Sequence, residues 1–454
     1  MLAALRRLHV LTLLAALIVV GSAHAGPPGK WTQATDPVLA NIDQLGLART
    51  PDDGILHIVW PKNVPGSGEI WHTRISSGGI VGARNPASWG WAVVGADPDL
   101  LVMPDGRLRL FFPGLGTTNE EAGAQSVDGD ASGSNWSPRG PRISNGLNVL
   151  TIGATLRSDG APIFALGGPG GVYHHTGLSL ADPDISFQGT PSNLCCLYNP
   201  ELATDESSGE TSVAYFSLRP GEAGVFVQTL AGPPQLVGHA MTGGNFLAPD
   251  SRMPLVSRAG GGVYLAYCKG YPTCKEAWLL KVLSGASPLR VGRGQTIEDV
   301  YASRAPDGRI WVLWWDSSKD RIYAIRTNKA ATRPGPVTSL TIPNGAGHVW
   351  KLFGEGSAGP LDLFASVDTS GKIAYWHQQV LPVLSLKCAS RAGALSCQVT
   401  DAGDSVAGAK VSAGGKSATA SGSGRVSIVL PPGTYRASAS KAGFAAAAAR
   451  FKVK

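Results

Sequence analysis

The sequence predicts an all-β protein, namely a seven-bladed β-propeller followed by a small β-sandwich. Its 454 residues include 59 Gly and 32 Pro, about a fifth of the chain, and both residue types disfavour helix interiors. Apolar residues reach 43%, which is too many for a disordered chain. A polar turn followed by an apolar strand recurs seven times, which is the signature of a repeat architecture.

Each repeat carries a glycine in the turn before its apolar strand. PDDG at 51–54 precedes ILHIVW, and PDGR at 306–309 precedes IWVLWW. Turns of this Asp-Gly type are a strong hairpin signal. Four-stranded units that recur every 47 to 54 residues are typical of propeller blades. The seven glycines are Gly54, Gly106, Gly160, Gly209, Gly261, Gly308 and Gly359.

A propeller must close its ring, and the last repeat has only three clear strands. We expect residues 30–34 to supply the fourth strand, because this segment precedes the first repeat as an outer strand would. Residues 380–384 (VLPVL) are the alternative.

The N-terminus predicts export. Arg6 and Arg7 precede an apolar run from Leu8 to Val20, and the small-residue segment AHA ends at Ala25. This pattern is typical of a secretory signal peptide over residues 1–25. The apolar run is shorter than the roughly 20 residues of a membrane span, and no other segment is long enough. We therefore expect a secreted or extracellular protein. Association with the cell envelope is compatible with this expectation.

The six cysteines form three close pairs in the sequence. Local disulfides are the simplest arrangement for Cys268 with Cys274 and for Cys388 with Cys397 in an oxidising compartment. The adjacent Cys195 and Cys196 can bond only through a strained ring, so their state stays open. Metal binding is the rival interpretation, but the CxxC spacing of zinc sites is absent from the sequence.

A shift in charge separates the two predicted domains, at 26–385 and 386–454. Residues 386–454 hold ten Lys and Arg against two Asp, a net charge of +8, whereas 26–385 hold 27 basic and 30 acidic residues, a net charge of −3. An exported basic domain favours an anionic surface or envelope polymer as partner over nucleic acid. A basic surface that is merely solvated is the alternative.

The C-terminal segment resembles the carboxypeptidase regulatory-like domain. The motifs that carry the resemblance cover about 50 residues, and they are Val399–Gly403, Gly408–Val411, Gly422–Val426, Leu430–Tyr435 and Lys441–Phe444. The resemblance implies a small β-sandwich that serves as a non-catalytic accessory module.

The second repeat resembles, loosely, the Asp-box of the sialidase group. Its SVDGDASGSNW segment holds Ser126, Asp128, Gly133 and Trp136 in the Asp-box order, with a longer loop. The resemblance implies a propeller. Sialidases also use three arginines on their substrate, and the innermost strands here offer only Arg252, so we do not expect sialidase activity.

The same loop suggests a calcium site as the one candidate cofactor site. Asp128, Asp130 and Ser132 place oxygen atoms at alternate positions before Gly133. Arg139 stands where a calcium loop has its bidentate Glu, and a plain hairpin tip is the alternative interpretation.

Polar residues recur near the start of every predicted inner strand, where they would surround the propeller's central funnel. The candidate ligand-binding residues are Asp97, Asp99, Asn199, Glu201, Asp250, Arg252, Glu298, Asp299 and His348. We expect them to bind an extracellular or cell-envelope glycan without catalysis. The alternatives are a glycoside hydrolase or polysaccharide lyase that uses paired carboxylates, and a protein-interaction scaffold.

Overall fold

The computed structural model describes most of the chain. It covers residues 29–40, 43–116, 123–138, 151–168, 171–175, 185–186, 197–217, 224–230, 232–238, 252–269, 274–343, 347–368, 370–391 and 393–453. Within these ranges the regular structure is β-strand apart from short 3-10 turns, which include η2 (Pro306–Gly308) and η3 (Ser317–Lys319). The prediction of an all-β protein is confirmed. The predicted signal peptide lies outside the described residues.

Seven antiparallel sheets follow one another between residues 32 and 380, and we number them I to VII in chain order. Sheet I contains β2 (Gly46–Arg49), β3 (Leu56–Val64), β4 (Ser67–Ile75) and β5 (Asn85–Trp91); sheet II contains β6 (Val93–Val94), β7 (Asp99–Val102), β8 (Leu108–Leu115) and β9 (Gly123–Gly129); sheet III contains β10 (Thr151–Leu156), β11 (Pro162–Gly168), β12 (Gly171–His175) and β13 (Ile185–Ser186). Sheet IV contains β14 (Leu197–Thr204), β15 (Thr211–Ser217), β16 (Gly224–Thr229) and β17 (Gln235–Gly238); sheet V contains β18 (Leu255–Ser257), β19 (Val263–Lys269), β20 (Glu276–Lys281) and β21 (Leu289–Arg293). Sheet VI contains β22 (Ile297–Arg304), β23 (Ile310–Asp316), β24 (Arg321–Arg326) and β25 (Thr338–Thr341); sheet VII contains β26 (Val349–Glu355), β27 (Leu361–Asp368), β28 (Ile373–Val380) and β1 (Thr32–Gln33).

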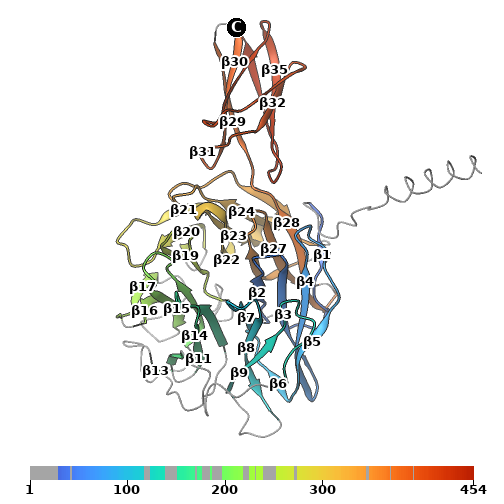
Figure 1. The fold of residues 1–454 in the computed structure, drawn as a ribbon, viewed down its shortest axis with the longest axis vertical. Helices are drawn as coiled ribbons and strands as arrows, with labels where there is room; N and C mark the ends of the chain where they lie inside the picture. Colours follow the sequence, from blue (N-terminus) through green and yellow to red (C-terminus); the bar gives the residue numbers. More distant parts are fainter. Residues whose placement is uncertain are drawn as a thin grey trace, which may run out of the picture.

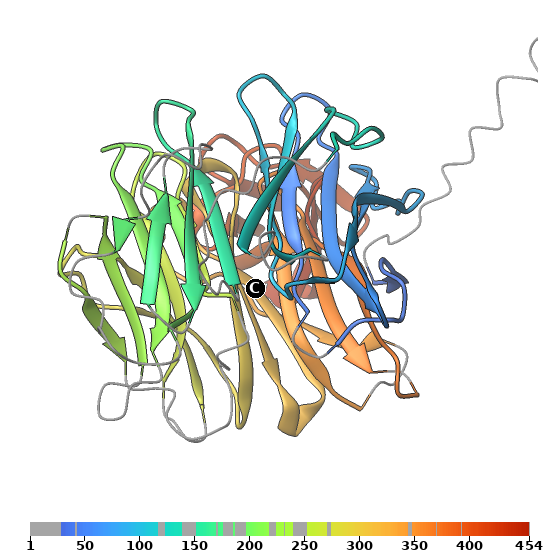
Figure 2. The same ribbon diagram turned by 90° about the horizontal axis from the view of Figure 1, so that it is seen from below.

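One strand of each sheet, which we call its leading strand, contacts the leading strands of the two neighbouring sheets. β2 contacts β7, and the chain of contacts continues through β10, β14, β18, β22 and β26 back to β2. The sheets therefore surround a common centre: β2, β7, β14 and β22 lie nearest to it in Figure 1, and Figure 2 shows the sheets from the side. Side chains at the starts of the leading strands meet at that centre.

Each predicted turn glycine lies in the turn between the leading strand of its sheet and the strand that follows it in the chain. Each of the seven has a positive φ, from 68° at Gly54 to 113° at Gly359. Residues with a Cβ rarely adopt this conformation, so the repeat of glycine in the sequence reflects a repeated backbone requirement.

The N-terminal segment completes sheet VII, as the closure argument predicted. Thr32 pairs with His377 and Gln33 pairs with Trp376, so β1 lies at the outer edge of the last sheet. Arg49 of β2 also forms ion pairs with Glu355 and Asp362 of sheet VII. The beginning and end of the series are thus held together by strand pairing and by buried charges.

Two further sheets lie beyond Val380 and share one apolar core (Figure 1). One contains β29 (Ser385–Arg391), β30 (Ala394–Asp401), β31 (Asp404–Ser405) and β34 (Arg425–Val429); the other contains β32 (Lys410–Ala413), β33 (Lys416–Thr419), β35 (Gly433–Ser440) and β36 (Ala447–Val453). Small and branched side chains such as Val399, Val411 and Ala437 fill the space between them.

An ionic contact joins this C-terminal unit to sheet VI. The carboxylate of Asp401 lies 2.5 Å from Arg326 and 3.0 Å from Arg309, and Asp404 lies 2.7 Å from Arg309. Both arginines are almost fully buried. The turn between β30 and β31 is therefore a docking element, because its two carboxylates bind two arginines of sheet VI.

No helix in the described part of the chain is long and apolar enough to cross a membrane.

Candidate functional site

Polar side chains fill the common centre of sheets I to VII. Each stands at or just before the leading strand of its sheet, and each is less than a tenth exposed. These residues, from sheet I to sheet VII, are Gln44, Asp99, Thr151, Glu201, Arg252, Asp299 and Lys351. We call this set the central ring. It contains three carboxyl groups and two cations, so much of its charge can be neutralised within the ring.

Arg252 is the hub of the central ring. Its Nη2 donates to Asp97 Oδ1 at 2.6 Å and to the carbonyl of Pro98 at 2.7 Å, and its Nη1 donates to Asp99 Oδ1 at 3.0 Å. Its Nε lies 3.3 Å from Glu201 Oε2. One guanidinium from sheet V therefore holds carboxylates from sheets II and IV across the centre.

Burial controls the protonation of this cluster. Desolvation raises the pKa of Asp97 to about 6, although Arg252 opposes the shift, and it raises the pKa of Glu201 well above its usual value. Burial alone would lower the pKa of Arg252, but its three carboxylate neighbours raise it instead. The guanidinium stays charged, and the buried acids bind protons more readily than solvent-exposed carboxyl groups do.

Asp99 and Asp299 each connect two neighbouring sheets through hydrogen bonds from backbone N–H groups to the carboxylate. Asp99 Oδ1 accepts from the backbone N–H of Leu100, and its Oδ2 accepts from Ala154 of sheet III at 2.6 Å. Asp299 Oδ1 accepts from Val300, and its Oδ2 accepts from Leu352 of sheet VII at 2.6 Å. Burial raises the pKa of Asp299 to about 7. These two predicted ligand-binding residues have backbone partners that give them a structural role.

Bulges at the start of two neighbouring leading strands direct other side chains away from the ring. The register of β22 shifts between Ile297 and Asp299, and that of β26 shifts between Val349 and Lys351. The extra residues are Glu298 and Trp350, and bulges commonly re-aim side chains in this way. Glu298 Oε2 lies 3.8 Å from His348 Nδ1, and the His348 ring lies 4.5 Å from the Trp350 ring.

We call Glu298, His348 and Trp350 the rim cluster. About a third of the side chain is exposed in both Glu298 and His348, in contrast to the buried ring beside them. The rim cluster thus offers a carboxylate, an imidazole and an indole at one place on sheets VI and VII.

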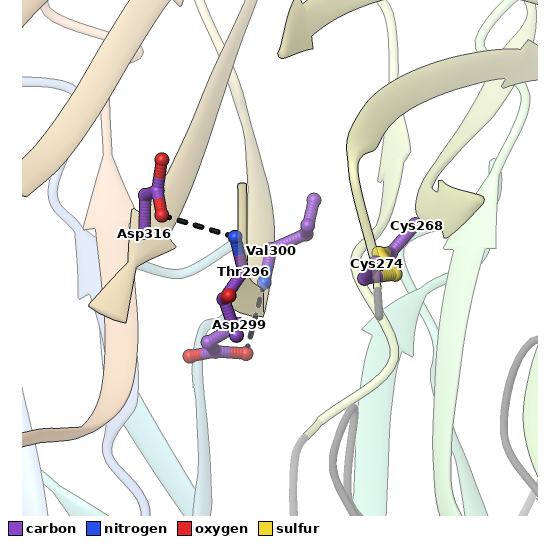
Figure 3. The surroundings of a disulfide bond; sticks show 6 residues. All are labelled: Cys268, Cys274, Thr296, Asp299, Val300 and Asp316. Atoms are coloured by element: carbon purple, nitrogen blue, oxygen red, sulfur yellow. Dashed lines mark hydrogen bonds between the residues drawn. A yellow bond between two sulfur atoms is a disulfide. The ribbon is translucent and has the colours of Figure 1, made fainter. Parts of the chain in front are cut away.

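The segment that leads to Glu298 is held from two sides (Figure 3). Asp316 accepts from the backbone N–H groups of Gln295 and Thr296, and the carbonyl of Cys274 accepts from Ile297 at 2.8 Å. Cys274 forms the predicted disulfide with Cys268. The local structure therefore places Glu298 on a fixed backbone.

The structure gives the predicted calcium ligands other partners. Asp128 pairs with Arg109 at 2.6 Å and with Arg107 at 3.1 Å, and Arg109 is its cross-strand neighbour in the β8–β9 pair. Asp130 accepts from Ser132, Ser134 and Asn135 and so holds the hairpin tip. Among the described residues no group of three acidic, His or Cys side chains is arranged to hold a metal ion. Asp128 and Asp130 thus already have arginine and hairpin-tip partners, and the calcium site stays a prediction.

The predicted site residues thus divide into two sets. Asp97, Asp99, Asn199, Glu201, Arg252 and Asp299 are buried at the centre, while Glu298 and His348 lie at the partly exposed rim. Asp250 and the Cys195–Cys196 pair lie outside the described residues. The predicted Cys388–Cys397 disulfide is present, joining paired positions of β29 and β30.

Four residues of these groups are not among the predicted ligand-binding residues. Gln44, Thr151 and Lys351 belong to the central ring and Trp350 to the rim cluster, whereas the sequence pointed to His348 on the last sheet. The bulge at Trp350 adds a residue to the strand, and only an alignment of all seven repeats on Asp99, Glu201 and Asp299 would have revealed it.

Comparison with known proteins adds similarity at the level of structure alone. No family model matches the chain, and no curated protein sequence matches it. The solved structure of Kuenenia stuttgartiensis hydrazine synthase is similar over 73% of this chain and 94% of its own, with a TM-score of 0.44 and 10% identity. A mutant of Trypanosoma rangeli sialidase is similar over 74% of this chain and 54% of its own, with a TM-score of 0.41 and 11% identity. The β-propeller domain of the Trilobed protease from Pyrococcus furiosus is similar over 74% of this chain and 95% of its own, with a TM-score of 0.38 and 8% identity.

Proposed function

We propose that the chain is an exported seven-bladed β-propeller with a C-terminal β-sandwich, and that the propeller binds a glycan without cleaving it. The observation that carries this proposal is the division between a buried, charge-paired centre and a partly exposed rim cluster. The contacts of the two groups favour different roles, which are argued in turn.

The central carboxyl groups are poorly suited to glycoside hydrolysis. That reaction needs a protonated acid and a carboxylate on either side of the sugar, about 5 to 9.5 Å apart. Asp97, Asp99 and Glu201 instead meet at one guanidinium and are less than a tenth exposed. A sugar ring would have to displace Arg252 to lie between them. This arrangement supports a structural centre over a catalytic one.

The rim cluster contains side chains of the types that proteins commonly use to bind sugars. The Glu298 carboxylate accepts hydrogen bonds from hydroxyl groups, and the His348 imidazole can donate or accept. The indole of Trp350 is partly exposed while its Nε1 is buried, so its contribution is an apolar face on which a sugar ring can pack. The distances of 3.8 Å from Glu298 to His348 and 4.5 Å from His348 to Trp350 bring the three groups within the span of one sugar unit.

The disulfides support the proposed location. Cys268–Cys274 and Cys388–Cys397 are both formed, and disulfides persist mainly in oxidising compartments. A periplasmic or extracellular site of action would present the protein to envelope glycans.

The rim cluster can be tested by substitution with a matched control. Glu298→Ala/His348→Ala should reduce the affinity for the best ligand on a glycan array at least about tenfold, equal to about 1.4 kcal/mol. Glu206→Ala/Arg304→Ala is the control. Arg304 lies at the opposite end of β22, its Nη1 lies 2.5 Å from Glu206 Oε1, and both side chains are partly exposed.

Unchanged binding in the rim variant would contradict the proposed site. Equal losses in both variants would indicate a general effect on sheet VI. If the intact protein retains no glycan but captures a defined protein, the scaffold alternative replaces this proposal.

A further inference from the structure

The outer face of one C-terminal sheet is strongly basic. Strands β33, β32, β35 and β36 contain no Asp or Glu. Arg436 of β35 is the direct cross-strand partner of Arg450 of β36, and Lys452 pairs with Thr434. Since paired residues share a face, these cations all point to the same side of the sheet. Lys410 joins them there, because it pairs with Ser440 of β35.

This face is turned to solvent. Arg436, Arg450, Lys452 and Lys410 are exposed, whereas the alternate residues Ala437, Ala439 and Val453 are buried in the shared core. We call the four cations the basic face. Two arginines directly opposite each other repel, so this pairing carries a cost in stability.

The acids that could neutralise the basic face are engaged elsewhere. The segment 386–454 contains only two acidic residues, Asp401 and Asp404. Both bind Arg309 of the propeller, and Asp401 also binds Arg326. The end of the unit that carries these acids lies against sheet VI, while the C-terminus lies at the far tip (Figure 1). Docking therefore leaves the cations near β36 without acids from their own unit.

We propose that the basic face binds an anionic polysaccharide. Cross-strand neighbours lie about 5 Å apart, and alternate residues along a strand about 7 Å apart, so a chain with repeated carboxylate or sulfate groups can contact several cations together. Arginine can bind such groups with two parallel hydrogen bonds. The neighbouring exposed residues Thr434, Ser438 and Ser440 offer hydroxyls rather than the aromatic and aliphatic side chains that insert into a lipid surface.

This inference does not depend on the rim cluster, and its test keeps the two separate. The full-length protein is applied to immobilised heparin, a sulfated and carboxylated polysaccharide, and eluted with a salt gradient. Arg436→Ser/Arg450→Ser should weaken heparin binding at least about tenfold. Lys387→Ser/Arg425→Ser removes the same charge from exposed positions of the other sheet and should change binding much less. Arg436→Lys/Arg450→Lys should retain a large part of the binding.

Thermal unfolding provides a readout that separates folding from binding. Removing the Arg436–Arg450 repulsion should leave the melting temperature unchanged or raise it at low salt. Equal loss of heparin binding in both double variants would overturn the proposal, since net charge alone would then be responsible. Binding to anionic phospholipid vesicles with none to heparin would also overturn it, in favour of a membrane surface.

Discussion

At the scale of single residues, two buried histidines link sheet I to the hairpin tip of sheet II. His57 Nδ1 lies 3.0 Å from His72 Nε2, and the His72 ring packs edge-on against Trp136. Asn85 contacts His72 and also donates to the carbonyl of Gly133. Burial lowers the pKa of both histidines to about 4. Their neutral state at neutral pH lets this interface remain closely packed.

These pKa values predict how stability depends on pH. Between pH 6.5 and about 4 the unfolded histidines bind protons while the folded ones do not, so their contribution to stability is lost as the pH falls through that window. At pH 5 the loss should reach about 2 kcal/mol for each histidine, or about 4 kcal/mol for the pair. Asp43 and Asp299, each with a pKa raised to about 7 by burial, act in the opposite direction. Urea unfolding at pH 7 and pH 5 should therefore show a smaller acid-induced loss in His57→Gln/His72→Gln than in the unsubstituted protein. Identical losses would contradict the assignment.

At the scale of elements, the leading strands depend on the charges where they meet. Arg252 binds carboxylates from β14 and from the segment around the start of β7, so it joins three sheets. Asp99 and Asp299 each bind a backbone group of the next sheet. The ring is therefore connected by side chains as well as by packing.

Removing the side chain of Arg252 should lower the stability of the fold. Arg252→Ala leaves three buried carboxyl groups without their cation and should lower the free energy of unfolding by about 3–5 kcal/mol. Arg290→Ala is the control, because Arg290 pairs with Glu276 in an exposed setting and such pairs contribute about 0–1 kcal/mol. Chemical denaturation of both variants at pH 7 measures the difference. Similar small effects would show that the centre does not need the guanidinium.

At the scale of the whole molecule, the sequence predicted features that depend on local backbone conformation. It did not predict most side-chain contacts between residues that are distant in the chain. The turn glycines and the local disulfides were predictable, because each follows from backbone conformation or short spacing. The edge strand at 30–34 was predictable despite its distant partner, because the last repeat lacked one strand. The partners of Asp128 were not, because Arg109 becomes its neighbour only through the register of β8 with β9. Similarly, spacing predicted polar residues at the centre, but not that Arg252 from sheet V would reach Asp97 in sheet II.

The central claim is that the molecule binds a glycan and leaves it intact, and one measurement tests it most directly. The full-length protein is screened on a glycan array, and its best ligand is then incubated with the protein in solution and analysed by mass spectrometry. We expect saturable binding and a ligand of unchanged mass after prolonged incubation. Shortened or unsaturated sugar products would contradict the account, since they would require a catalytic site that the buried, arginine-bound carboxyl groups do not provide.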